Sequence, residues 1–489
     1  MSDPADSRSW LPWRWPGWFC RVLLLMLVVL AVAAAFTVRA WCLSHVPDVA
    51  EPFDVNRFYP GDLPPKQNAF THYKEASRTF VTVRNDWQKS PGPKATPRDW
   101  EFQHVFAEGL SALSETELEW LADHRAALDE WRRGTERSAA QAYTFQEVSG
   151  NTLLPVHQDA RCFIAFARIE ALRCEADGDL KGAWEWCRAS VRFVRHLSSH
   201  GGLIERAIGA SGHRLAAGGV ARWAEHPAVT ADELRAALIE IRTEYALHAP
   251  LSETLKGEYL FWRQAFLSPD WAKTDPFGVF VNMPAWEQRL SSLRRPVMWV
   301  VGEPEIALRL SRQILHNQLT EIDKPLGQRS KLVGTAVMLF DPDPDVTLQP
   351  GQLDPTRIEF SLKHSLIKQL RTKGAGATFS TKTVDDAVWN ERARQAALEV
   401  LLAAQAYRRD TGEFPESLNQ LVPQYLEAVP LDPCDRHGGR LRYRRDLPTN
   451  GVVWSVGIDG NDEGGVLNID VKTVGSADVG FVLKSGEPK

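Results

Sequence analysis

One uncharged apolar run near the N-terminus constrains this chain more than any other feature of the sequence. Val22–Val38 reads VLLLMLVVLAVAAAFTV and contains no charged residue. As a helix it would be about 26 Å long, close to the ~30 Å hydrocarbon core of a bilayer. Arg21 and Arg39 flank the run, and arginine side chains can extend from such positions toward the polar interface. The run therefore predicts one membrane-spanning helix over residues 18–41.

The tryptophans and arginines around this run predict how it is oriented. Four of the 18 tryptophans precede the run and one follows it: Trp10, Trp13, Trp15, Trp18 and Trp41. Indole rings favour the membrane–water interface, so this arrangement is typical of an aromatic belt on both sides of a bilayer. More arginines precede the run than directly follow it: Arg8, Arg14 and Arg21 against Arg39 and Arg57. The positive-inside rule then places an arm, residues 1–17, in the cytoplasm and the body in the periplasm.

A cleaved signal peptide is the alternative to an anchor. The run follows a basic segment and contains small-residue cleavage patterns at Ala31-Val32-Ala33 and Ala33-Ala34-Ala35. We favour the anchor because the apolar run continues past these sites and Trp41 follows it. In the alternative, the body is exported after signal cleavage, so both interpretations place it outside the cytoplasm.

The middle of the chain predicts a linker followed by a helical body. Residues 44–66 are rich in proline and aspartate, as is typical of a linker, and we expect a helical extracytoplasmic body over residues 67–373. Apolar spacing and capping patterns predict helices at Ala69–Val83, 114–133, 153–225, 231–247, 251–267 and 303–320. Residues 177–193, which begin with a Gly178-Asp179 turn, resemble the second half of a tetratricopeptide repeat. We therefore expect helical hairpins that are weakly similar to such repeats.

The pattern changes in the C-terminal module that we assign to residues 390–475. An alanine-rich helix with Tyr407 precedes a series of short motifs, followed by two predicted strands. The motifs are, in order, Asp410-Thr411-Gly412, Phe414-Pro415-Glu416-Ser417-Leu418, Leu421, Tyr425-Leu426, Val429-Pro430-Leu431-Asp432-Pro433, Tyr443 and Trp454-Ser455-Val456-Gly457-Ile458-Asp459-Gly460. This series resembles the C-terminal part of the major pseudopilin, the G-type subunit, of type II secretion systems. The resemblance implies a small α+β module.

Two departures from that family matter. In a pseudopilin the membrane helix continues directly into this module, whereas here most of the chain lies between them. The leader motif is also absent, because the fifth residue after Gly17 is Val22 and not a glutamate. We therefore do not expect this chain to polymerise as a pilin. The whole chain looks like a bacterial membrane-anchored envelope protein that carries a pseudopilin-like tail.

An acidic loop in this module is a candidate calcium site. The resemblance implies calcium binding there, and the loop carries oxygen donors at Asp459, Asn461, Asp462, Glu463 and Asp470. The alternation of the first donors, a glycine at 464 and the later aspartate match the ligand spacing of a calcium loop. The alternative is a solvated acidic turn whose glycines allow positive φ. Asp341, Asp343 and Asp345 also alternate, but the prolines between them favour a linker.

No residue pattern predicts a catalytic centre. The sequence contains no GxSxG, HExxH, Walker or GxGxxG motif. His196 and His200 are one helical turn apart, with His213 further on, but a zinc site needs a third ligand and an orienting shell. Cys162, Cys174 and Cys187 fall in apolar helical stretches, so we expect small buried hydrophobes, and a bridge among them stays open.

Together these patterns predict a mainly α protein with one N-terminal transmembrane helix, a helical-hairpin body and a small α+β tail. Its expected function is protein–protein contact in the envelope, with type II secretion or pilus-like machinery as the candidate partner. The alternative is an envelope hydrolase with a dispersed active site in the helical body. Nucleic acid is not an expected partner, because the net charge is −5 and no basic run occurs.

Overall fold

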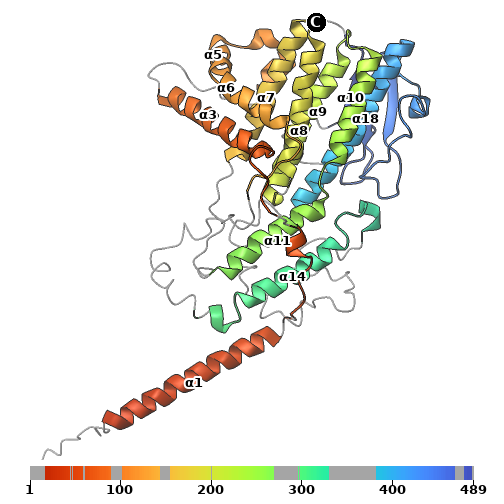
Figure 1. Cartoon of the computed structure of the whole chain (residues 1–489). Coiled ribbons are helices and arrows are strands. Elements are labelled where there is room, and N and C mark those ends of the chain that lie inside the picture. The colour runs from red at the N-terminus through yellow and green to blue at the C-terminus, as the bar shows by residue number, and fades with distance from the viewer. Residues whose placement is uncertain are drawn as a thin grey trace, which may run out of the picture.

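A mainly helical body stands on one long apolar helix. The computed structural model describes residues 17–44, 46, 48–58, 61–89, 102–143, 155–199, 201–268, 296, 298–329, 381–467 and 478–486. Helix α1 (Gly17–Ser44) extends away from the body in Figure 1, and its apolar side chains are exposed along most of its length. It is long and apolar enough to cross a membrane. The body thus has one apolar extension, as the sequence predicts.

The upper part of the body is a bundle of packed helices. Its members are α3 (Ala69–Lys89), α4 (Gln103–Glu108), η1 (Leu110–Ala112), α5 (Glu115–Asp123), α6 (Arg125–Thr135), α7 (Pro155–Ala176), α8 (Leu180–Ser198), α9 (Leu203–Glu225) and α10 (Ala231–Ala246). Helix α3 lies against α6, and α7, α8 and α9 pack on one another in succession (Figure 1). The predicted turn at Gly178-Asp179 joins α7 to α8, and Gly178 has a φ of 76° that favours glycine.

Local sequence signals account for these helices. The apolar spacing predicted at the start of α3 is confirmed, because Ala69, Tyr73 and Phe80 are buried. A capping box forms at Ser114, whose side chain accepts from the Glu117 amide. One prediction was wrong in detail: the helix expected over 114–133 is two helices that meet at His124. That residue is buried, and its ring is 4.6 Å from the Phe80 ring, so tertiary packing fixes the bend.

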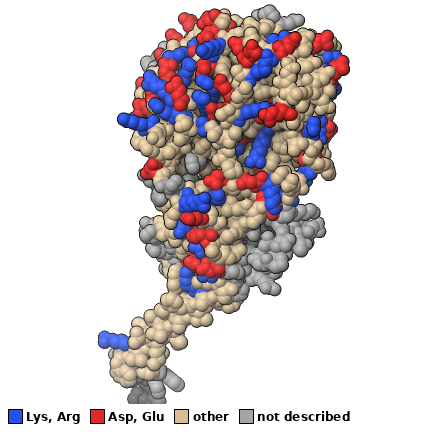
Figure 2. Space-filling view, turned by 45° about the vertical axis from the view of Figure 1, so that its right-hand side comes forward, with Lys and Arg blue, Asp and Glu red and all other residues tan. Residues whose placement is uncertain are grey.

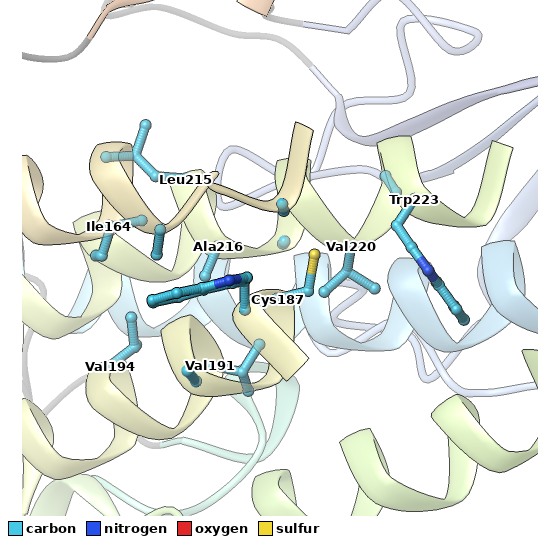
Figure 3. Close-up of a cluster of buried hydrophobic side chains, with 14 of the residues drawn as sticks. Ile164, Cys187, Val191, Val194, Leu215, Ala216, Val220 and Trp223 are labelled. Carbon is cyan, nitrogen blue, oxygen red and sulfur yellow. The ribbon is translucent and has the colours of Figure 1, made fainter. Parts of the chain in front are cut away.

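The main core lies where α7, α8 and α9 meet. Figure 3 shows its centre, in which Ile164 of α7 faces Val194 of α8 and Ala216 of α9. Small residues allow this close approach: a Cβ on Gly212 would lie 3.0 Å from Ile164 and 3.3 Å from Val194. Cys187 is also buried here as a free thiol. The sequence prediction of small buried hydrophobes therefore holds at this cysteine.

The C-terminal segment packs directly on the bundle. Helix α18 (Thr381–Thr411) lies against α9 and α10 on one side and against the small sheet on the other. The remaining elements are η3 (Leu418–Leu421), β1 (Arg442–Leu447), β2 (Asn450–Ser455) and β3 (Val479–Lys484). The strands form an antiparallel sheet in the order β1-β2-β3, with Tyr443 opposite Val453 and Val453 opposite Phe481. The third strand was not predicted and begins after residue 475.

A second layer of helices lies between the bundle and α1. It consists of α11 (Leu251–Leu267), α14 (Glu305–Leu319) and the short η2 (Leu326–Gln328) (Figure 1). Helices α11 and α14 pack side by side. Their shared core is separate from the main one and includes Leu255, Tyr259 and Leu315. Residues 48–58, here named the strap, contain α2 (Val55–Phe58) and connect α1 to this layer. The predicted linker at 44–66 thus includes a helical turn.

Candidate functional site

A buried ion pair lies where α9, α10 and α18 meet. Arg206 Nη2 is 2.5 Å from Glu391 Oε2, and the two residues are only 3% and 0% exposed. Burial opposes ionisation of Glu391, but Arg206 and two nearby histidines outweigh it and hold the pKa of this carboxyl at about 2. Glu391 is therefore a carboxylate throughout the physiological pH range. The pair fixes α18 to α9 by charge as well as by apolar packing.

Two neutral histidines surround this ion pair. Burial lowers the pKa of His213 to about 3 and that of His248 to about 4. His213 Nε2 is 2.8 Å from the Tyr245 hydroxyl, and His248 Nδ1 is 3.7 Å from Glu391 Oε1. His213 Nδ1 and both ring nitrogens of His248 are buried, and no described residue forms a hydrogen bond with them. The pKa values mean that neither ring carries a charge near pH 7, so Arg206 is the cation that neutralises Glu391.

This polar centre does not have the geometry of a metal site. Two histidines and a glutamate are common metal ligands. Over the described ranges, however, no group of three or more His, Cys, Asp or Glu side chains is placed to hold one ion. Arg206 also occupies the position beside the carboxylate that a cation would take. The arrangement therefore acts as a polar core that specifies how three helices fit together.

Of the two histidines that lie one helical turn apart in the sequence, the structure describes one. His200 lies outside the described residues, whereas His196 is buried and its Nδ1 is 2.7 Å from the Tyr73 hydroxyl. Arg195 Nη2 donates to His196 Nε2 at 3.0 Å. Because arginine can only donate, Nε2 accepts, and the proton of the neutral ring is on Nδ1, which donates to Tyr73. Burial holds the pKa of His196 well below its usual value. His196 therefore joins α3 to α8.

Two glutamates face each other at the start of α9. A Cβ on Gly202 would lie 2.7 Å from Glu258 Oε2 and 3.3 Å from Glu205 Oε2, so both carboxyl groups surround one point. Glu258 accepts from the Leu203 amide at 3.1 Å and from Trp262 Nε1 at 2.9 Å, and Tyr143 donates to Glu205. Burial and the nearby Glu205 raise the pKa of Glu258 to about 7. Glu258 and Glu205 are therefore a pair of neighbouring carboxyl groups in which Glu258 has the raised proton affinity.

The raised pKa predicts a pH-dependent stability that Glu258→Gln removes. The folded chain holds the Glu258 proton more tightly than the unfolded chain, whose carboxyl has a pKa of about 4.3. The stabilisation is complete below that value and is lost as pH rises through about 7. We expect the Tm of the parent protein to fall from pH 6 to pH 8 more steeply than that of Glu258→Gln.

The matched control is Glu225→Gln, because burial also raises the pKa of Glu225 to about 7 at the other end of α9. Each variant should reduce the fall of Tm between pH 6 and pH 8. In the double variant, Tm should depend on pH less than in either single variant. Equal slopes in the parent and Glu258→Gln would show that Glu258 is ionised in the folded chain at pH 6.

The acidic loop of the C-terminal module is partly committed to internal contacts. Asp462 accepts from Trp454 Nε1 at 2.9 Å and from the Gly464 amide at 3.0 Å, and it lies 3.3 Å from Arg442. Asp459 accepts from the Asn461 amide at 3.1 Å. These bonds shape the turn. Asp470, like Asp341, Asp343 and Asp345, lies outside the described residues.

Glu463 lies instead beside Asp478, a residue that the sequence reasoning missed. Burial raises the pKa of both carboxyl groups; Asp459 and Asp478 raise that of Glu463 further, whereas hydrogen bonds to Asp478 oppose the rise in its own pKa. Glu463 Oε2 and Asp478 Oδ1 are buried, and no group in the described part of the chain donates a hydrogen bond to them. Asp478 Oδ2 accepts from the Gly465 amide at 2.7 Å. Two hard oxygens with raised pKa values suit a calcium ion, which would relieve their repulsion.

The strap holds α1 to the lower helical layer through one half-buried acid, Glu51. Glu51 Oε1 accepts from Arg263 Nε at 3.0 Å and from Arg312 Nη2 at 3.2 Å, and Tyr259 donates to Oε2. Burial opposes the charge, but these hydrogen bonds lower the pKa of Glu51. Arg312 Nη1 also donates to Asp48 at 2.9 Å. The strap is therefore cross-linked to both α11 and α14.

Helix α14 also contacts the end of α1 directly. Arg309 Nη1 donates to the Val46 carbonyl at 3.0 Å and to the Leu43 carbonyl at 3.3 Å. Leu43 lies in the last turn of α1, where backbone acceptors have no partner within the helix, and Val46 follows that turn. Arg309 thus binds backbone carbonyls at the C-terminal end of α1. This contact gives the body a defined orientation relative to that helix.

The buried acids could have been found from their helical register. Val384, Val388 and Glu391 recur at helical spacing on one buried face of α18, so a charged residue occupies an apolar stripe. Arg206 and His213 have the same relation to the buried face of α9. A charge on such a stripe usually has a partner, and two such stripes in one chain suggest that they meet. No comparable signal marks Asp478, which follows the loop at a distance in sequence.

Comparisons with known proteins give no relative for this chain. No protein family model matches it, and no match was found among curated proteins or solved structures.

Proposed function

We propose that this protein is a membrane-tethered extracytoplasmic scaffold that acts by protein–protein contact. The observation that carries the proposal is the cross-linked junction around Glu51, which joins α1 to the body in one orientation. A flexible tether would suit an enzyme that reaches dispersed substrates. A fixed junction instead suits a body that presents one surface at a set height above the membrane.

The distribution of charged residues supports a body in water and a helix α1 in the bilayer. Figure 2 shows Lys, Arg, Asp and Glu mixed over the bundle, whereas α1 is almost free of them. A surface of mixed sign keeps a protein soluble in water, and an uncharged exposed helix is stable only in an apolar environment. The bundle therefore belongs in the aqueous compartment and α1 in the bilayer. We assign that compartment to the periplasm on the arginine distribution given above.

The C-terminal module is the part that we propose contacts other envelope proteins. Its alanine-rich helix, short 3-10 turn and antiparallel sheet follow the order of the pseudopilin-like motifs. Tyr443 donates to the Pro415 carbonyl at 2.7 Å, so two of those motifs are in contact. These features support a pseudopilin-like tail, and with it type II secretion or pilus-like machinery as partner. The helical hairpins α7–α8 and α8–α9 likewise support the weak likeness to tetratricopeptide repeats.

Topology and partners can be tested in the same cells. With an epitope tag at each end, protease added to spheroplasts should remove the C-terminal tag and spare the N-terminal one. Protection of both tags would contradict the periplasmic assignment, and loss of the N-terminal tag before protease is added would indicate signal cleavage. A pull-down from solubilised membranes should recover secretion or pilus-like components. Recovery of none would contradict the link to that machinery.

The paired carboxyls at the start of α9 favour a second candidate, an envelope hydrolase. Glu258 would hold a proton at neutral pH, and Glu205 lies beside it as a potential base. The test is hydrolysis of isolated cell-wall polymer by the full-length protein. The enzyme candidate requires that Glu258→Gln removes the activity and that Glu225→Gln retains it.

We also propose that Glu463 and Asp478 are ligands of a calcium ion. Calcium should raise the Tm of the full-length protein relative to the same protein in chelator, because an ion bound only to the folded chain stabilises it. Glu463→Gln should abolish this difference. Asp446→Asn should not, since Asp446 is an exposed residue of β1 that pairs with Arg444, away from Glu463 and Asp478 in the sequence. A Tm that does not respond to calcium in the parent protein would identify the loop as a solvated turn.

A further inference from the structure

A tryptophan of the body packs against the apolar face of α1. Trp299 lies just before α14, and its ring centroid is 5.1 Å from that of Phe36 at an interplanar angle of 85°. Phe36 belongs to the uncharged run Val22–Val38 and is itself largely exposed. The body therefore does not begin where α1 ends. Part of it lies alongside the last turns of the apolar helix.

The position of Phe36 sets the depth of this contact. The run is centred on Leu30, and the six residues from there to Phe36 span about 9 Å of helix. Half of a bilayer hydrocarbon core is about 15 Å, so a centred run places Phe36 inside the apolar region. The Trp299 ring contacts both Phe36 and Arg39, so it would lie in the outermost part of the hydrocarbon, just below the boundary that Trp41 reaches on α1. Indole rings favour that boundary because one edge is apolar and the N–H is polar.

Arg39 shows how a charge is accommodated at the same level. Its Nη1 donates to the Trp299 carbonyl at 2.5 Å and to the Glu303 carbonyl at 3.1 Å. Its guanidinium also lies over the Trp299 ring, 4.7 Å from the centroid. A cation near the edge of the bilayer usually extends toward water. Here the body itself satisfies the cation, which binds the segment around Trp299 to α1.

The lower layer has its own apolar cluster next to this contact. Phe266, Met298 and Leu308 are buried in it, and the half-buried Trp262 packs against them. Leu267, the last residue of α11, is 55% exposed. An exposed apolar side chain next to a membrane-spanning segment is continuous with the surface that lipid covers. Lys, Arg, Asp and Glu also occur on the lower layer down to its junction with α1 (Figure 2), so the proposed apolar contact is confined to Trp299 and Leu267.

We propose that this end of the body, where the half-buried Trp299 and the exposed Leu267 lie over the buried cluster around Phe266, rests in the membrane–water interface as a second lipid contact. The occupant is the boundary between lipid headgroups and acyl chains. The inference rests on the proposed anchoring of α1 and deepens it. The protein then contacts the membrane at two points: α1 spans the bilayer, and the segment around Trp299 lies on the bilayer surface.

Depth-dependent fluorescence quenching tests the proposal. Cysteines introduced at Leu30, Val300 and Ile239 would each be labelled with a small fluorophore in full-length protein that carries Cys20→Ser and Cys174→Ser. Trp299 is retained because it binds Arg39. The proteins are reconstituted in phosphatidylcholine vesicles that contain nitroxide-labelled lipid. Ile239 is 66% exposed on α10 and reports a position away from the bilayer.

The proposal requires the labels at 30 and 300 to be quenched several-fold more than the label at 239. Quenching at 30 with none at 300 would overturn the proposed lipid contact near Trp299 and leave the membrane insertion of α1 intact. No quenching at 30 would overturn both the insertion of α1 and the lipid contact near Trp299. A label at 300 that is shielded from both nitroxide lipid and aqueous iodide would indicate protein contact with a second copy, and would also overturn the lipid assignment. A label at Leu267→Cys gives an independent reading if the variant at 300 does not fold.

Discussion

Replacing Trp131 by alanine is expected to lower the free energy of unfolding by about 3–5 kcal/mol, the usual cost of removing a large buried ring. Trp131 is fully buried in α6, where it stacks on Phe163 of α7 at 6.0 Å and meets Phe193 of α8 at 5.2 Å. The indole thus holds three helices together. Chemical unfolding of the full-length protein in detergent, followed by far-UV circular dichroism, would measure the change.

The matched control is Trp131→Phe. It keeps a stacked ring and removes Nε1, which has no hydrogen-bond partner. The smaller ring leaves a cavity, whereas the loss of an unpaired buried donor offsets part of that cost. We expect Trp131→Phe to destabilise the protein by less than half as much as Trp131→Ala. Equal losses for the two variants would mean that the ring is not what joins α6 to α7 and α8.

The second large effect is expected from Arg206→Met. Removing one partner of a buried ion pair leaves a charge without compensation, and the typical cost is about 3–5 kcal/mol. Glu391 would then be a buried acid without its cation, and its proton affinity should rise. The double variant Arg206→Met/Glu391→Met should be more stable than either single one, because it leaves no buried charge.

An exposed ion pair supplies the control for this variant. Arg235 is paired with Asp232 and Asp410 on the surface, so Arg235→Met should cost no more than about 1 kcal/mol. The pH dependence adds a second check. The folded pKa of Glu391 is about 2, below the unfolded value, so its stabilisation is present above the unfolded pKa and is lost as pH falls toward 2. A double variant that is no better than the single ones would contradict this account.

Much of the helical architecture follows from the sequence because its signals are local. The capping box at Ser114 and the apolar spacing of α3 act within one or two turns. Helices α10 and α11 begin and end within a residue of their predicted bounds, since Thr230 caps the first and Pro250 precedes the second. The apolar run of α1 needs no tertiary partner to be recognised.

The parts that could not be predicted depend on contacts between distant segments. Strand β3 is half-buried and shows little alternation, so only its pairing with β2 defines it. Glu391 and Arg206 are almost two hundred positions apart, so the helical register marks each as a charge on a buried face, but only the tertiary fold fixes the contact between them. Similarly, the strap resembles a linker in composition. It is ordered by Arg263, Arg312 and Tyr259, which lie far away in the chain.

The packing of α18 has a consequence for how the chain unfolds. Helix α18 is covered by α9 and α10 on one side and by β2 and β3 on the other. Separating the small sheet from the bundle would therefore expose one apolar side of α18 to water. The bundle and the C-terminal module should for this reason unfold together, in one cooperative transition.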